Sequence, residues 1–207
     1  MNPMMSLIML IVSIFLVTAL NVVLNKNSKC LKKGIGWQHY LFGYFFILYL
    51  MITLSRVVGF PSLSEWKFCL SVGNPIFNPH INLVPFRDGI DISSVLNIIL
   101  FMPLGFLLPT LWKKYRSLWK TFCYGLSFSL IIEIGQLFVS HRATDVNDLI
   151  MNTLGTICGW VIFNIVKKVS RQFADKTVVD ISSSDTFAIK SEPYLYVVIA
   201  IICALLQ

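Results

Sequence analysis

Four charged side chains lie close together in the segment 133–160, EIGQLFVSHRATDVNDLIMNTLGTICGW, although only 13% of the chain is charged. They are Glu133, Arg142, Asp145 and Asp148, and the polar residues between them include Gln136, His141, Asn147 and Asn152. Carboxylates can act as general acid or base, and a guanidinium binds phosphate or carboxylate groups bidentately. The segment therefore has the residue types for acid–base chemistry or for binding an anionic group.

A second polar segment, 73–91 (GNPIFNPHINLVPFRDGID), contains Gly and Pro at short intervals and is expected to form a structured loop. Arg87, Asp88 and Asp91 lie at its end, and Asn97 follows within the next apolar run. In that run Pro103 should kink a helix, because it has no N–H to donate, while Gly105 permits close contact with a neighbouring helix.

Other kinds of site have little support. The five cysteines form no CxxC pair, and His80 and His141 have no partners at metal-ligand spacing. We therefore expect no disulfide framework, no metal site and no cofactor. The sequence contains no HExxH motif, phosphate-binding loop or nucleophile elbow.

Composition indicates the class of protein. The 207 residues are 56% apolar, whereas soluble domains are about 45–50% apolar and about 25% charged. The net charge of +7 is not arranged as a basic stripe interleaved with aromatics, so a nucleic-acid partner is not expected. The sequence predicts an all-α integral membrane protein whose surroundings are membrane lipids.

Five apolar runs approach the roughly 20 residues that a helix needs to cross a bilayer. They are Met4–Leu24, Tyr40–Val58, Ile92–Trp112, Leu118–Val139 and Leu149–Val166. A sixth run, Tyr194–Leu206, is shorter and can cross, re-enter or lie at the interface; a crossing is the interpretation we favour. The prediction is a bundle of five to six transmembrane helices.

Lysine and arginine set the orientation. They are concentrated in the loops after the first, third and fifth runs, whereas the other loops carry only Arg56, Lys67, Arg87 and Arg142. Cytoplasmic loops are enriched in Lys and Arg. The N-terminus and the segments 59–91 and 140–148 are therefore expected outside, in a multi-pass protein.

The chain is divided by these patterns into four parts. Residues 1–39 form an N-terminal anchor with a basic cytoplasmic loop, and 40–166 form the main membrane domain. The polar segment 167–192 is expected to be a flexible cytoplasmic linker. Residues 193–207 form a C-terminal hydrophobic segment.

The polar groups of 133–160 should meet just below the outer surface. Glu133 and Gln136 share one helix face, and Asp145, Asp148 and Asn152 share a face of the returning helix. Simpler roles remain open: Asp145 as a helix cap, Arg142 as an interfacial anchor, and Gln136 and Asn152 as interhelical hydrogen-bonding groups. Glu133, an ionisable group inside a span, is the strongest functional candidate; its structural alternative is a pair with Arg142 or Arg87.

Three blocks of the sequence together resemble the VanZ-like family: NLVPFRD (82–88), NIILFMPLGFLLP (97–109) and E-x-x-Q…R-x-x-D-x-x-D-x-x-x-N-x-x-G (133–155). The resemblance covers roughly 40–166; Gly135 and Asn147 depart from the usual residues. It implies a small multi-pass bacterial cell-membrane protein from a family associated with resistance to the lipoglycopeptide teicoplanin. The shared positions are Asn82, Pro85, Phe86, Arg87, Asn97, Pro103, Gly105, Glu133, Gln136, Arg142, Asp145, Asp148, Asn152 and Gly155.

Three functions fit these observations. The first is binding of a cell-envelope ligand, such as a lipid-linked wall precursor or the antibiotic, with an effect on teicoplanin susceptibility. The second is an intramembrane enzyme acting on a lipid-linked substrate, with Glu133 and Asp148 as acid and base. A transporter ranks third, because the chain is small and shows no inverted repeat. The candidate cluster in all three comprises Asn82, Phe86, Arg87, Asn97, Glu133, Gln136, Arg142, Asp145, Asp148 and Asn152.

Overall fold

A computed structural model describes residues 3–27, 35–77, 79–86, 89, 91–139, 142, 144–180 and 187–207. The described chain is almost entirely helical, which confirms the all-α membrane class. The helices are α1 (Pro3–Asn27), α2 (Trp37–Ile52), α3 (Leu63–Ser71), α4 (Ile92–Leu111), α5 (Leu118–Gln136), α6 (Val146–Val169), α7 (Arg171–Thr177) and α8 (Phe187–Leu205). A π-helical segment, Thr53–Val57, continues α2, and a 3₁₀ turn, Lys113–Arg116, follows α4.

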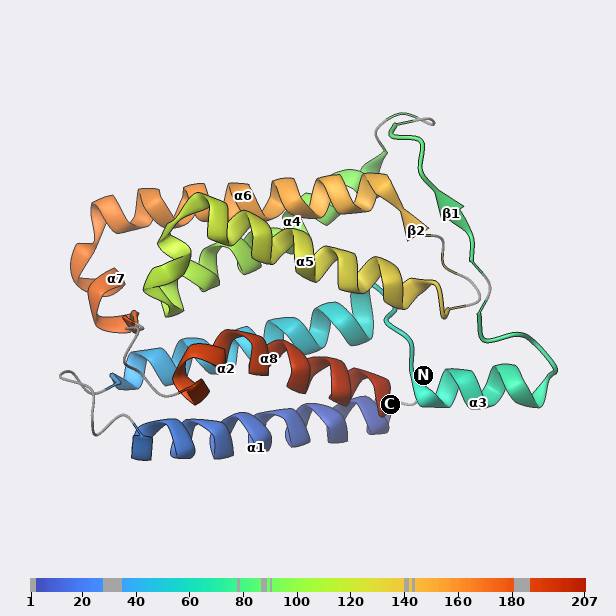
Figure 1. The fold of residues 1–207 in the computed structure, drawn as a ribbon, viewed down its shortest axis with the longest axis horizontal. Helices are drawn as coiled ribbons and strands as arrows, with labels where there is room; N and C mark the ends of the chain where they lie inside the picture. The colour runs from blue at the N-terminus through green and yellow to red at the C-terminus, as the bar shows by residue number, and fades with distance from the viewer. Residues whose placement is uncertain are drawn as a thin grey trace.

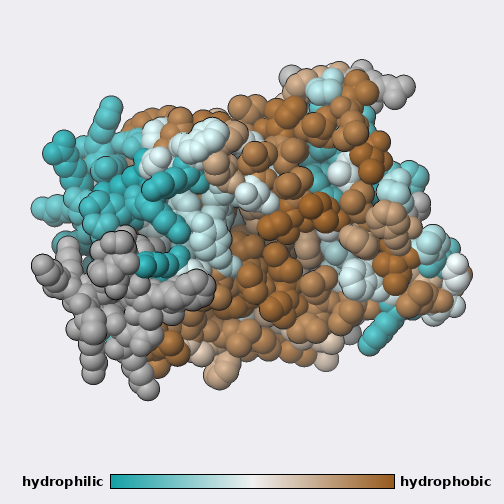
Figure 2. Space-filling model, viewed as in Figure 1, coloured by the Kyte–Doolittle hydropathy of each residue, from teal (hydrophilic) through white to brown (hydrophobic). Residues whose placement is uncertain are grey.

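Six helices, α1, α2, α4, α5, α6 and α8, run side by side along the long axis of the molecule (Figure 1). The short helix α3 lies beyond one end of this bundle and α7 lies at the other, and we refer to the α3 end and the α7 end. Hydrophilic residues gather at the α7 end, and a hydrophobic belt covers the middle (Figure 2). Such a belt is the surface that a bilayer requires.

Each predicted span corresponds to one helix of the bundle. Among the described residues, four segments are long and apolar enough to cross a membrane: Met4–Asn25, Trp37–Val57, Ile92–Leu111 and Val146–Val169. The helices α5 and α8 have 19 residues each, about 28 Å at 1.5 Å per residue, and lie alongside those four. Charged residues, such as Glu133 in α5 and Glu192 in α8, interrupt their apolar character. The total of five or six crossings therefore stays a prediction.

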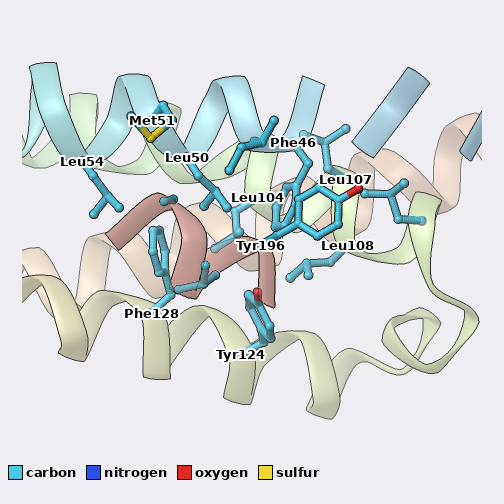
Figure 3. Close-up of a cluster of buried hydrophobic side chains, with 14 of the residues drawn as sticks. Phe46, Leu50, Met51, Leu54, Leu104, Leu107, Leu108, Tyr124, Phe128 and Tyr196 are labelled. Atoms are coloured by element: carbon cyan, nitrogen blue, oxygen red, sulfur yellow. The ribbon is translucent and has the colours of Figure 1, made fainter. Parts of the chain in front are cut away.

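The core lies between α2, α4, α5 and α8 (Figure 3). Phe46 and Leu50 from α2 meet Leu104 from α4, Phe128 from α5 and Tyr196 from α8, and all five are buried. Lipid tails are as apolar as these side chains, so burial by itself does not hold such helices together. Close packing and interhelical hydrogen bonds must supply the stability.

The closest helix pair is α4 with α6, and glycines make it possible. A Cβ added to Gly105 would lie 1.9 Å from the Thr156 carbonyl oxygen, and one added to Gly159 would lie 2.0 Å from that of Met102. The prediction that Gly105 permits close helix contact is thus confirmed. Gly155 and Gly159 form a G-x-x-x-G pair, the small-residue spacing that lets two helices approach in a membrane.

The segment expected to be a flexible linker is partly folded against the α7 end of the bundle. Val179 pairs through its backbone with the end of α4, accepting from Lys113 N at 3.0 Å and donating to Leu111 O at 2.8 Å. Arg116 bonds Asp175 at 3.1 Å. This packing satisfies backbone groups that the end of α4 leaves without partners. Residues 181–186 lie outside the described residues.

Candidate functional site

The two polar segments meet at the α3 end through a small parallel ladder of β1 (Ile81–Asn82) and β2 (Thr144–Asp145). Ile81 pairs with Thr144 and Asn82 with Asp145. The Asn82 side-chain amide also donates to Asp145 Oδ2 at 3.2 Å. The ladder places the first signature block directly beside the start of α6.

Glu133 is the buried acid of this end, with only 4% of its surface exposed. Its Oε2 accepts a hydrogen bond from the backbone N–H of Asp145 at 3.1 Å, and its own carbonyl accepts from Thr144 Oγ1 at 3.0 Å. The carboxylate therefore sits at the N-terminus of α6, where the helix dipole favours negative charge.

Arg142 is not the partner of Glu133 that the sequence suggested. Its Nη2 donates to the Val57 carbonyl at 3.3 Å, and its guanidinium packs against Gly59, whose φ of +65° suits only glycine well. Within the described residues, the ion pairs do not include Arg142. The other proposed partner, Arg87, lies outside the described residues.

The first turn of α6 forms hydrogen bonds with α4 and with the loop before it. Asp145 is the N-cap, accepting from Asn147 N at 2.8 Å, which confirms the capping role expected for it. Asn97 donates to Asp148 Oδ1 at 2.6 Å. Asn147, one of the two departures from the family pattern, accepts from Phe86 N at 2.8 Å and so holds the loop at a residue with the unusual φ of 54°.

Two amides lie deeper in the bundle. Gln136 donates to the Val58 carbonyl and Asn152 to Ser129 Oγ, each at 2.9 Å, and both side chains are buried. These bonds confirm the interhelical hydrogen-bonding role considered for them. In the described part of the chain, Gln136 Oε1 and Asn152 Oδ1 have no hydrogen-bond donor. Each can therefore accept one more hydrogen bond.

Acidic residues outnumber basic residues in and around this cluster. Asp91 caps α4 and accepts from Ser94 and Ser93, and these hydrogen bonds lower its pKa to about 2. Glu133, Asp145 and Asp148 are the acids of the cluster itself, against Arg142 as the described cation. We call Asn82, Asn97, Glu133, Gln136, Arg142, Asp145, Asp148 and Asn152 the polar cluster. The described residues contain no group of three or more His, Cys, Asp or Glu side chains suited to a metal ion.

Sequence reasoning missed a second polar group, buried at the α7 end. Glu192 of α8 contacts His39 Nε2 at 2.9 Å and accepts from Trp112 Nε1 at 2.8 Å. His39 Nδ1 lies 3.2 Å from the Thr177 carbonyl. All three side chains at the centre, His39, Trp112 and Glu192, are 1% exposed or less. His39, Trp112 and Glu192 lie in three separate segments and belong to no recognisable motif, so neither motif nor spacing signals the group.

Comparison with known proteins gives two matches. The family model described as VanZ/LLP1 matches residues 45–167. Protein VanZ of Enterococcus faecium is 35% identical over 97 residues, which is 45% of this chain and 60% of that protein. The alignment thus spans less than two thirds of the relative. No solved structure matches. The matched family region contains the whole polar cluster, whereas α1, α7 and α8 lie outside it.

Proposed function

The chain belongs to the VanZ/LLP1 family, and from this premise we propose that it is a multi-pass protein of the bacterial cell membrane that binds a cell-envelope ligand through the polar cluster. Such binding would lower susceptibility to teicoplanin, as the resemblance to the VanZ-like family suggested. The observation that carries the proposal is the convergence, at the α3 end, of polar side chains from the β1 loop, α4, α5 and α6.

The chemistry of the cluster favours a ligand rich in O–H and N–H groups. Carboxylate oxygens are hydrogen-bond acceptors, and the partly exposed Asp145 and Asp148 present them at the start of α6. Arg142 is exposed at the edge of the cluster and can bind a phosphate or carboxylate. A lipid-linked wall precursor combines both features, with sugar hydroxyls beside a phosphate.

The orientation of the bundle is tested by labelling. Cytoplasmic loops are enriched in Lys and Arg, and these residues are concentrated in the loops at the α7 end, so the α3 end is predicted to be external. In a cysteine-free background, Asn74→Cys at the α3 end should react with a membrane-impermeant maleimide on intact cells. Arg171→Cys at the α7 end should react only after lysis, although both positions are exposed. The native Cys69 is a poor reporter because it is buried. Labelling of Arg171→Cys alone on intact cells would mean that the orientation is the reverse of the predicted one.

The phenotype is tested in a susceptible Gram-positive host. Expression of this protein should raise the inhibitory concentration of teicoplanin by more than that of vancomycin, because the acyl chain of a lipoglycopeptide inserts into the outer leaflet beside the proposed site. An empty vector sets the baseline. An equal shift for both antibiotics, or no shift, would show that the family phenotype does not extend to this chain.

The enzyme remains the second candidate, because Glu133 is a buried carboxyl group near Asp148 in the same cluster. Glu133→Gln keeps a hydrogen-bond acceptor for Asp145 N but cannot exchange a proton at neutral pH. If purified protein consumes a lipid-linked precursor and Glu133→Gln abolishes this turnover, the enzyme is the correct assignment. Binding that persists in Glu133→Gln without turnover in either protein supports the first.

A further inference from the structure

A hollow on the lipid-facing side of the bundle lies between α5 and α8, away from the polar cluster. Its volume is about 590 Å³. The α5 residues that line it recur every three or four positions from Trp119 to Ile131, and those of α8 do the same from Tyr194 to Ile201. One face of each helix therefore borders the hollow, which we call the α5–α8 groove.

The length of this groove matches one leaflet of a membrane. Along α5 the lining residues span twelve positions, or about 18 Å at 1.5 Å per residue. A bilayer has a hydrocarbon core of about 30 Å, so one leaflet is about 15 Å thick. Most of the lining is apolar, including Phe128, Ile131, Val197 and Ile201.

Two lysines lie at the α7 end of the groove. Lys114 Nζ is 4.7 Å from the ring centroid of Tyr194 and 4.8 Å from that of Tyr115. The neighbouring cations Lys113 and Arg116 are paired with Asp180 and Asp175, but the ion pairs of the described residues include neither Lys114 nor Lys120. Burial lowers the pKa of Lys114, the contact with Tyr194 opposes this shift, and repulsion from Lys120 lowers the pKa further. An anion placed between the lysines would relieve that repulsion.

We propose that the α5–α8 groove binds an anionic phospholipid, with an acyl chain along the apolar faces and the phosphate between Lys114 and Lys120. Basic pockets between transmembrane helices on the cytoplasmic side are suited to anionic head groups. Trp119, at the same level, suits the membrane interface. The proposal does not rest on the proposed function: the lysines that would bind the phosphate lie at the α7 end of the bundle, opposite the polar cluster, and α8 lies outside the family match.

Native mass spectrometry of the purified full chain tests this proposal. Phosphatidylglycerol should be retained in preference to phosphatidylcholine of the same acyl composition. The double variant Lys114→Ala/Lys120→Ala should bind phosphatidylglycerol at least roughly tenfold more weakly, since each lysine near anionic lipid contributes about 1 kcal/mol. Val198→Trp, which fills the groove from α8, should weaken retention of both lipids.

The matched control is Lys167→Ala/Lys168→Ala, which removes two cations from the α7 end without touching the groove. This control should retain phosphatidylglycerol as the parent does. An equal loss in the control, unchanged binding in Lys114→Ala/Lys120→Ala or in Val198→Trp, or full competition by inorganic phosphate would each overturn the proposal. A lipid-free dimer that Val198→Trp dissociates would assign the groove to a second copy of the chain instead.

Discussion

Replacing Glu192 by alanine is expected to destabilise the protein more than any other single change considered for it. The carboxylate is the common partner of His39 and Trp112, and no water reaches the three side chains, which are 1% exposed or less. Removing one member of a buried hydrogen-bonded group leaves its partners unsatisfied, which costs about 1–3 kcal/mol for each partner. Through these contacts Glu192 joins α8 to the start of α2 and the end of α4.

Thermal unfolding in detergent, followed by circular dichroism, measures this effect. Glu192→Gln is the matched variant: it keeps the size of the side chain and one oxygen acceptor for Trp112, so its loss should be clearly smaller. A mutation of the exposed Asp180, whose pair with Lys113 is on the surface, should change stability by less than about 1 kcal/mol. If Glu192→Ala unfolds at the parent temperature, the buried group does not hold α8 to the bundle.

Replacing Asp145 by alanine is expected to have the largest effect at the polar cluster. Asp145 caps α6 through the bond from Asn147 N and receives a second bond from Asn82. Loss of an N-cap costs about 1 kcal/mol, and loss of a partly buried hydrogen bond costs about 1 kcal/mol more. The sum, roughly 2 kcal/mol, should be accompanied by loosening of the β1–β2 ladder.

Asp145→Asn separates the two contributions. Asparagine caps a helix as well as aspartate does, but its amide nitrogen cannot accept from Asn82. We therefore expect about half of the destabilisation of Asp145→Ala in the same detergent assay. Equal losses for the two variants would mean that the cap contributes nothing and that the whole effect comes from the bond between Asn82 and Asp145.

The sequence could predict those parts of the fold that depend on residues close together in the chain. The long apolar runs predicted each helix of the bundle, and the residue order around Asp145 predicted its capping role. Gly105 predicted a close contact between helices. The strands β1 and β2 have two residues each, too few for any periodicity, so only the structure reveals that they pair.

Contacts between residues that are far apart in the sequence could not be predicted from it. His39 and Glu192 are 153 positions apart, and nothing local distinguishes either as half of a buried pair. The pairing suggested for Glu133 and Arg142 rested on their matched depth along two helices. A matched depth does not determine which way a side chain points: Glu133 accepts from the start of α6, while Arg142 donates to the Val57 carbonyl at the end of the π-helical segment after α2. The roles of the described cluster residues in function stay predictions.

The most direct test of the polar cluster as the functional site is the teicoplanin susceptibility of a host that expresses Arg142→Ala/Asp148→Asn. Arg142 is exposed and Asp148 half-buried, and asparagine at 148 still accepts from Asn97, so the variant should fold and reach the level of the parent. Immunoblotting of membranes verifies that level. We expect the variant to leave the host as susceptible to teicoplanin as an empty vector does. Protection equal to that of the parent, at equal expression, would contradict it.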